Sequence, residues 1–299
     1  MNIPLLLINL KNRPERLKNT LKILEELNIC DFITRVNACD KDEVIKHKFR
    51  YMNYLTYKNI TGNIISTFIP PTWGAVACGL SHKKCWRYIV KNNLNYAIIC
   101  EDDLLISDKN KFLFSFNMAK HFLNISSNSG SINMILFGSE YYDAENENME
   151  NNNMTCVEGG FNKLHFYIIT NSCAKFFLRN ITTINLQIDV MIGKLNSWSN
   201  KIKIYNFKNC GLRQNNKFKS DVRYVFIKRR DLDYFRLGNN ILDIIYGYLP
   251  NENDLNHNFD DDWLIEHLNL WTNIGSTEQE LINFGDNIFS PENFNISLN

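Results

Sequence analysis

The sequence lacks a hydrophobic run of the length that crosses a membrane, which takes about 20 consecutive apolar residues. It also lacks a typical secretory leader, because residues 1–5 carry no basic residue and Asn9 interrupts the apolar run that ends at Leu10. We therefore expect no membrane span and a cytoplasmic location, with a secretory lumen or a virion as the alternatives.

An excess of charge of one sign is also missing. The chain has 33 Lys and Arg residues against 32 Asp and Glu residues, for a formal net charge of +1. Nucleic-acid binding needs a clustered basic surface, so we expect no nucleic acid as a partner. The basic run at residues 217–230 is expected to be a solvated face.

Paired cysteines are absent as well. The eight cysteines occur singly, without a C-x-x-C motif and without a paired metal-binding spacing, which predicts a reducing compartment. Four of them lie in apolar stretches, and we expect these to be small buried hydrophobes: Cys78, Cys85, Cys100 and Cys173.

The residues that are present predict a folded protein. A hydrophobic content of 44% is sufficient to bury a sizeable core. Asparagine is far more frequent than in ordinary proteins, and isoleucine and lysine are also frequent. This bias suggests an AT-rich genome, such as that of a parasite or a giant DNA virus, and says little about function.

Segments with strand and helix patterns alternate along the chain. Leucines at positions 17, 21, 24 and 27 have helical spacing, and Pro14 suits a first helical turn. We expect strands at residues 4–10, 32–36, 96–100, 133–138, 166–170 and 203–207, and helices at residues 14–27, 75–91, 112–123 and 174–178. This alternation predicts an α/β domain with a mostly parallel sheet.

The pattern changes in three places. Residues 50–67 and 143–155 have no clean period and are expected to be surface loops. From about residue 226 the strands give way to helix-like stretches. We therefore expect a catalytic domain at residues 1–225 and a helical C-terminal appendage, residues 226–299, packed on it.

Three consecutive acidic residues, Glu101, Asp102 and Asp103, directly follow the apolar run at residues 97–100. Ligands of open α/β sheets bind beyond the carboxyl ends of the strands. Alternate residues of an extended segment face the same way, so Glu101 and Asp103 can point at one ion, and carboxylates suit Mg²⁺ or Mn²⁺. The alternative is a solvated acidic turn.

Four segments in this order resemble glycosyltransferase family 25, which includes bacterial lipopolysaccharide sugar transferases and procollagen galactosyltransferases. They are INLKNRPER at residues 8–16, RVNACD at 35–40, GAVACGLSHKKCW at 74–86 and AIICEDD at 97–103. The likeness extends more loosely to about residue 225. It implies a GT-A type fold with a Rossmann-like sheet.

The resemblance also implies an activity: metal-dependent, inverting transfer of a hexose from a UDP-sugar to a hydroxyl group. Galactose is favoured and glucose is second. The acceptor would be the hydroxylysine of a collagen-like protein or a saccharide chain, and the cofactor Mn²⁺ or Mg²⁺. The oligomeric state is left open between a monomer and a homo-oligomer.

The resemblance implies metal ligands among the acidic residues. We expect Glu101 and Asp103 to bind the ion, and Asp102 to contact the ribose or to act through water. The family's late histidine ligand is not evident here, so Asp221 is the further candidate, with Gln214 beside it.

Five further residues are expected to bind the donor. Asn9 and Arg13 follow the first strand and would contact uracil or pyrophosphate, whereas Arg16 is expected to be solvated. Asp40 would bind the ribose or uracil, with a solvated turn as the alternative. The resemblance favours donor binding by Ser81 and His82, although a lone histidine in a helix is more often structural.

Asp189 is the expected catalytic base. It is a lone acid in an apolar run, where burial is costly without a partner, and an inverting transfer needs a base beside the acceptor hydroxyl. The alternative is the N-cap of a helix beginning at Val190. Two other functions remain open: a degenerate, non-catalytic transferase fold, and a metal-dependent phosphohydrolase, although the acidic triplet lacks the D-x-D-x-[TV] pattern of the latter.

Overall fold

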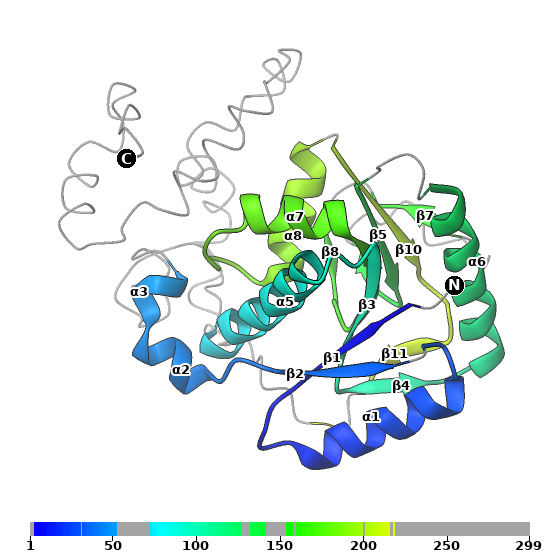
Figure 1. Cartoon of the computed structure of the whole chain (residues 1–299), viewed down its shortest axis with the longest axis horizontal. Helices are drawn as coiled ribbons and strands as arrows, with labels where there is room; N and C mark the ends of the chain where they lie inside the picture. Colours follow the sequence, from blue (N-terminus) through cyan, green and yellow to red (C-terminus); the bar gives the residue numbers. More distant parts are fainter. Residues whose placement is uncertain are drawn as a thin grey trace, which may run out of the picture.

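The computed structural model describes residues 3–30, 32–52, 72–126, 132–141, 154–157, 160–199, 201–215 and 218. Within these ranges the chain forms a central β-sheet with helices on both faces (Figure 1). The α/β class is therefore confirmed. The helical appendage at residues 226–299 and Asp221 lie outside the described residues, as do most of the two expected loops. The boundary at residue 225 stays a prediction.

The central sheet has seven strands in the order β2-β1-β3-β9-β5-β10-β7. Their bounds are Leu5–Asn9 for β1, Ile33–Asn37 for β2, Tyr96–Glu101 for β3, Ile132–Phe137 for β5, Thr155–Cys156 for β7, Phe166–Thr170 for β9 and Ile202–Phe207 for β10. The six expected strands all form, each within two residues of its predicted bounds.

The sheet is mixed. Strands β2, β1 and β3 are parallel neighbours, and so are β5 and β10. Strand β9 lies antiparallel to both of its neighbours, β3 and β5, and the short β7 is antiparallel to β10. The expected mostly parallel sheet is thus confirmed, with these two strands reversed.

Two small sheets complete the strands. Strand β4 (Leu104–Ile106) pairs with β11 (Leu212–Gln214), and β6 (Glu140–Tyr141) pairs with β8 (Phe161–Asn162), both antiparallel. Gly211, just before β11, has a φ of +76°, and a Cβ there would collide with the carbonyl of Asp108. Glycine therefore permits the close approach that brings β11 beside the acidic triplet.

The helices are α1 (Pro14–Leu27), α2 (Lys41–Lys46), α3 (Lys48–Tyr51), α5 (Trp73–Lys91), α6 (Lys109–Ser126), α7 (Asn171–Asn180) and α8 (Ile188–Trp198). Helix α1 has the predicted bounds. Helices α5 and α7 begin earlier than expected because Thr72 and Thr170 cap them, each accepting a hydrogen bond from a backbone N–H three residues on. The short α2 and α3 were not predicted, and α8 was anticipated only in the alternative in which Asp189 caps a helix beginning at Val190.

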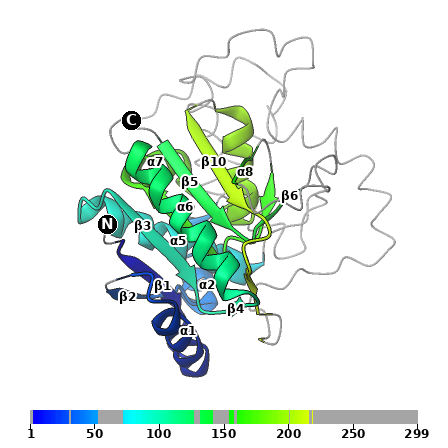
Figure 2. The same cartoon turned by 90° about the vertical axis from the view of Figure 1, so that its right-hand side faces the viewer.

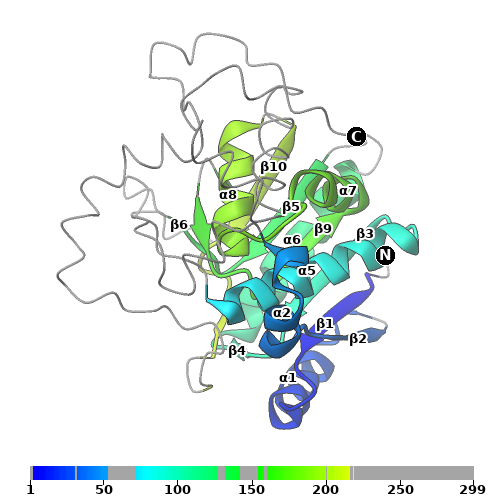
Figure 3. The same cartoon turned by 90° about the vertical axis from the view of Figure 1, so that its left-hand side faces the viewer.

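The strands bury both faces, as expected for a sheet covered by helices on each side. Alternate residues of β1 illustrate this: Leu5 and Leu7 pack with α1 and α6, whereas Leu6 and Ile8 pack with α5. Helix α6 crosses the face toward the viewer in Figure 2, and α5 and α7 cover the opposite face in Figure 3. The sheet is thus the middle of three layers.

The topology places one edge of the sheet at the candidate site. Because β2, β1 and β3 run in parallel, their carboxyl ends meet there, with Asn9 opposite Asn37 and Ile8 opposite Glu101. None of the described helices is long and apolar enough to cross a membrane.

Candidate functional site

A pocket of about 290 Å³ lies at the carboxyl ends of β1, β2 and β3, beside the first half of α5. Its polar lining consists of Asn9, Asn12, Arg13, Arg16, Asp40, Lys41, Ser81, Glu101, Asp102, Asp103 and Gln214. Most of the residues that the sequence singled out therefore surround one cavity. The exceptions are His82 and Asp189, which do not line it, and Asp221, which is not among the described residues.

Arg16 joins the carboxylates of Asp102 and Asp103. Its Nη2 lies 2.7 Å from Oδ1 of Asp102 and 3.2 Å from Oδ2 of Asp103, and all three side chains are more than nine-tenths buried. The expectation of a solvated Arg16 is therefore wrong. A buried guanidinium between two carboxylates offsets part of their charge and fixes their positions.

Asn9 holds Asp102 from the first strand. Its Nδ2 donates to Oδ2 of Asp102 at 2.6 Å and to the carbonyl of Arg13 at 3.0 Å, and its Oδ1 accepts from Nε of Arg35 at 3.1 Å. The amide is 1% exposed and already uses both donors and an acceptor. Asn9 thus connects β1, β2 and the acidic triplet, and its contact with a donor stays a prediction.

Asp103 carries an incompletely offset charge. Its Oδ2 accepts from Nε2 of Gln214 at 2.7 Å, but its buried Oδ1 has no hydrogen-bond partner among the described residues. Burial, with the nearby charge of Glu101, raises the pKa of Asp103 to about 7, although Gln214 and Arg16 counteract this. Gln214, named beside Asp221 as a candidate for the further ligand, thus contacts the triplet, and its role as a ligand stays a prediction.

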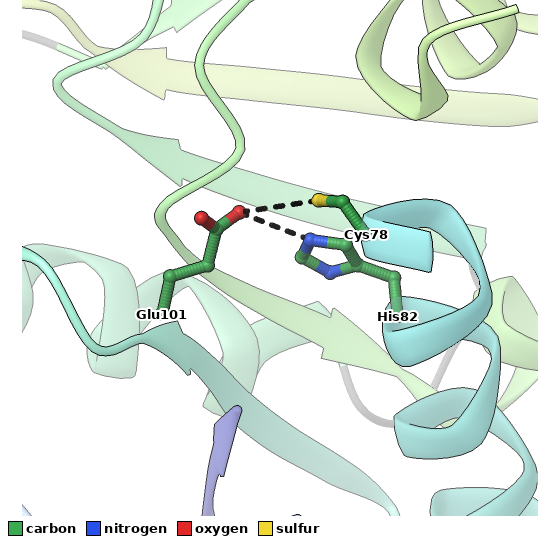
Figure 4. Close-up of side chains that lie close together, drawn as sticks. All are labelled: Cys78, His82 and Glu101. Carbon is green, nitrogen blue, oxygen red and sulfur yellow. Dashed lines mark hydrogen bonds and ion pairs between the residues drawn. The ribbon is translucent and has the colours of Figure 1, made fainter. Parts of the chain in front are cut away.

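Glu101 is held by two residues of helix α5 (Figure 4). Its Oε1 lies 3.1 Å from Nε2 of His82 and 4.0 Å from Sγ of Cys78. Figure 4 shows the other carboxylate oxygen pointing away from both. Glu101 therefore has one oxygen bound to α5 and one that is not, and it lines the pocket.

His82 is fully buried and connects Glu101 with the core. Its Nδ1 lies 3.0 Å from Oη of Tyr167, which also accepts a hydrogen bond from Nε1 of Trp86 at 3.0 Å. Since the indole can only donate, the tyrosine hydroxyl can donate a hydrogen bond to Nδ1, and Nε2–H then donates to Glu101. This places His82 beneath Glu101 rather than at the pocket surface, and donor binding by His82 stays a prediction.

Ser81, Asp40 and Arg13 do line the pocket. The hydroxyl of Ser81 donates to the carbonyl of Ala77 and accepts from the N–H of Cys39, both at 2.8 Å, so it fixes the segment after β2 against α5. Asp40 caps α2 by accepting from the N–H of Asp42 at 2.8 Å. Asp40 is half-buried, so the expected solvated turn describes it only in part.

Asp189 lies in the first turn of α8, where Gln187 is the N-cap. The alternative reading of Asp189 as an N-cap is therefore wrong. Its two oxygens accept from the N–H groups of Val190 at 2.9 Å and Lys163 at 3.1 Å. Burial raises the pKa of Asp189, and the charge of Glu101 adds to the effect, while these two backbone bonds lower it. Its role as a base stays a prediction.

The acidic residues at the pocket fit a hard divalent cation. Carboxylate oxygens are its preferred ligands, and the unpartnered oxygen of Asp103 with its raised pKa marks negative charge that Arg16 does not fully offset. Glu101 and Asp103 could hold such an ion, and Gln214, whose amide nitrogen contacts Asp103, lines the same pocket. The expected participation of Asp221 stays a prediction.

Sequence reasoning missed the place of Arg16 and Cys78 in the site, and it did not name Asn12 and Lys41, which also line the pocket. Arg16 shares a helical face with the buried residues Thr20, Leu24 and Leu27, and this spacing was the available signal. Cys78 is half-buried at the pocket and not in the core, unlike the other three cysteines expected there. Its signal was the four-residue spacing to His82, which places both on one face of α5.

A known protein family matches the part of the chain that carries all the pocket residues except Gln214. The family model described as glycosyltransferase family 25 (LPS biosynthesis protein) matches residues 2–192. The match includes the acidic triplet, the helix that carries Cys78 and His82, and Asp189. No curated protein sequence matches the chain.

Proposed function

The chain belongs to glycosyltransferase family 25, and on this premise we propose that it transfers a hexose from a UDP-sugar to a hydroxyl group, with a divalent cation. The observation that carries the proposal is the pocket in which the acidic triplet and three cationic side chains, Arg13, Arg16 and Lys41, face one cavity. A nucleoside diphosphate needs both kinds of partner, because cationic groups and a bound cation share its charge.

Glu101 and Asp103 would hold the cation, Mn²⁺ or Mg²⁺, with Gln214 beside them. When bound, the ion supplies Lewis-acid stabilisation of the charge that develops on the departing diphosphate. Arg13, just before α1, and Lys41, at the start of α2, would bind the phosphates. Asp102, fixed by Arg16 and Asn9, would orient the ribose.

Asp189 would act as the base of an inverting transfer. The acceptor hydroxyl gives its proton to the Asp189 carboxylate, its oxygen forms the new bond to the anomeric carbon, and the bond to the UDP oxygen breaks. The raised pKa of Asp189 supports this role, since a base works best when its pKa lies nearer the ambient pH. Its engagement with two backbone N–H groups keeps the carboxylate in one orientation.

Galactose is the hexose that we favour, followed by glucose, and the acceptor class is a collagen-type hydroxylysine or a saccharide chain. The family description, which refers to LPS biosynthesis, supports a saccharide acceptor. A GT-A type arrangement is consistent with the parallel β2-β1-β3 unit that carries the pocket on its carboxyl edge.

Isothermal titration calorimetry with UDP tests the proposal. We expect UDP to bind about tenfold or more tightly with Mn²⁺ than with a chelator, because the cation joins the diphosphate to the carboxylates. Asp103→Asn should remove this difference. Asp108→Asn is the matched control, because Asp108 lies outside the pocket and caps α6 by accepting from the N–H of Lys111, which asparagine does equally well.

A screen of UDP-sugars, measured by UDP release with and without acceptors, then assigns the hexose. Equal UDP affinity with Mn²⁺ and with chelator would remove the cation from the proposal. UDP binding without release of UDP from any sugar donor would favour a degenerate, non-catalytic transferase fold. Release of phosphate from simple phosphoesters would point to the phosphohydrolase alternative.

A further inference from the structure

Cys78, His82 and Glu101 bring a sulfur, a nitrogen and an oxygen atom to one place beside the pocket (Figure 4). Cys78 and His82 lie four residues apart on one face of α5, and Glu101 reaches them from the end of β3. We propose that these three side chains form a binding site for a thiophilic divalent cation of the zinc class, which shares only Glu101 with the proposed hard-cation site.

The distances fit such a site closely. The three ligand atoms lie within 4.8 Å of one another, with 3.1 Å between Nε2 of His82 and Oε1 of Glu101. Tetrahedral Zn²⁺, with bonds of about 2.0 Å to nitrogen and oxygen and about 2.3 Å to sulfur, places its ligand atoms roughly 3.3 to 3.6 Å apart. The imidazole and carboxylate are thus already at the required separation, and the thiol needs a side-chain movement of about 1 Å.

The surroundings of His82 suit a metal ligand. A metal-bound histidine usually donates its other ring N–H to an oxygen, which fixes the ring. Here Nδ1 lies 3.0 Å from Oη of Tyr167, whose second partner is Nε1–H of Trp86. When Nε2 binds the ion, Nδ1–H donates to this hydroxyl, which has two acceptor sites for the two donors.

The pocket supplies the route of entry. Cys78 and Glu101 line it, whereas His82 lies behind them. An ion can therefore reach the three ligands from the cavity, and a fourth position on the pocket side is left for water, as in zinc sites that keep an open position. Binding converts the Cys78 thiol to a thiolate, and the proton leaves to solvent.

The two proposed sites share Glu101 but differ in their other ligands. Thiolate and imidazole select zinc-class ions, whereas Mn²⁺ and Mg²⁺ prefer the carboxylate oxygens of Asp103 and its neighbours. The inference rests on the geometry of the three side chains and does not depend on transferase activity.

Cobalt titration of the full-length protein tests the site directly. Co²⁺ takes the same tetrahedral ligands as Zn²⁺ and gives a near-ultraviolet charge-transfer band only when it binds a thiolate. We expect one equivalent of Co²⁺ to produce this band in the chelator-treated protein, Zn²⁺ to remove it, and excess Mn²⁺ to leave it. Cys78→Ser should lose the band, and its affinity for Co²⁺ should fall by at least about tenfold.

Two further variants serve as a control for surface binding and as a test of the role of Tyr167. Cys156→Ser removes the exposed cysteine, and the band should persist there, so that binding at a surface thiol is distinguished from binding at the site. Tyr167→Phe should keep the band while Co²⁺ affinity falls about 10- to 100-fold, because the hydrogen bond to His82 is lost. No band in the wild-type protein, or a band that survives in Cys78→Ser and disappears in Cys156→Ser, overturns the proposal.

Discussion

Replacing Asp103 by asparagine should stabilise the cation-free protein at neutral and alkaline pH. The amide keeps the shape of the side chain, and its oxygen can still accept from Nε2 of Gln214. What it removes is a charge that burial and Glu101 disfavour, as the raised pKa of Asp103 shows. It also weakens the contact with Arg16, which retains its closer partner, Asp102.

The magnitude follows from the two pKa values. Asp103 titrates at about 7 in the folded protein against an ordinary value of 3.8. Between these values the folded state keeps a proton that the unfolded state has lost, so the stability of the wild type falls as the pH rises. About three pH units at 1.36 kcal/mol each amount to roughly 4 kcal/mol, fully expressed above pH 7.

Urea unfolding in the presence of a chelator measures this effect. The free energy of unfolding of Asp103→Asn minus that of the wild type should rise by roughly 3 to 4 kcal/mol between pH 4.5 and pH 8.5. Asp108→Asn, whose side chain lies outside the pocket, supplies the matched comparison. A difference that stays constant within about 1 kcal/mol across this range would refute the raised pKa of Asp103.

Three further changes have expected outcomes. Asp189→Asn should lower transfer by about 10²-fold with UDP affinity near wild type. Because an amide has one acceptor oxygen for two N–H groups, this variant should also lose about 1 to 3 kcal/mol of unfolding free energy. The control Ser139→Ala removes the hydrogen bond to the carbonyl of Lys163, whose N–H contacts Asp189, and should lower stability without the loss of transfer. Arg16→Gln should cost about 3 kcal/mol or more in urea unfolding, because two buried carboxylates lose their cation, and added Mn²⁺ should recover part of it. Burial lowers the pKa of Lys83 to about 8, so the wild type should gain stability relative to Lys83→Met as the pH rises from 8 to 10, since the folded state then lacks a proton that the unfolded state retains; parallel curves for the two proteins would contradict this.

Local sequence patterns predicted the helices and strands well, but they did not predict the direction of β9 or the long-range pairing of strands. Pro14 and the leucine spacing predicted α1 within its observed bounds, and the apolar run at residues 166–170 predicted β9. The reversed direction of β9 was not predictable from this run, because a strand buried on both faces has the same composition in either direction. The pairing of β4 with β11 joins segments about a hundred residues apart, which no local signal reveals.

The sequence indicated the location of the candidate site more accurately than the side-chain contacts within it. The position of the acidic triplet at the end of β3 indicated a pocket there, because ligands of parallel sheets bind beyond the carboxyl ends of the strands. The sequence could not show that Arg16 neutralises Asp102, since the ion pair joins α1 to β3. Nor could it show that His82 faces Glu101, because this depends on how α5 packs over the sheet.

The antiparallel strand β9 has a consequence for synthesis of the protein. Strands β3 and β5 are both made before β9, which lies between them in the sheet. A nascent chain that has passed β5 but not residue 166 therefore lacks the strand that pairs with both β3 and β5, whose apolar residues are buried in the folded protein. Unpaired apolar edges recruit other chains, so ribosome-bound intermediates of this length should depend on chaperones, and the dependence should end once residues 166–170 have emerged.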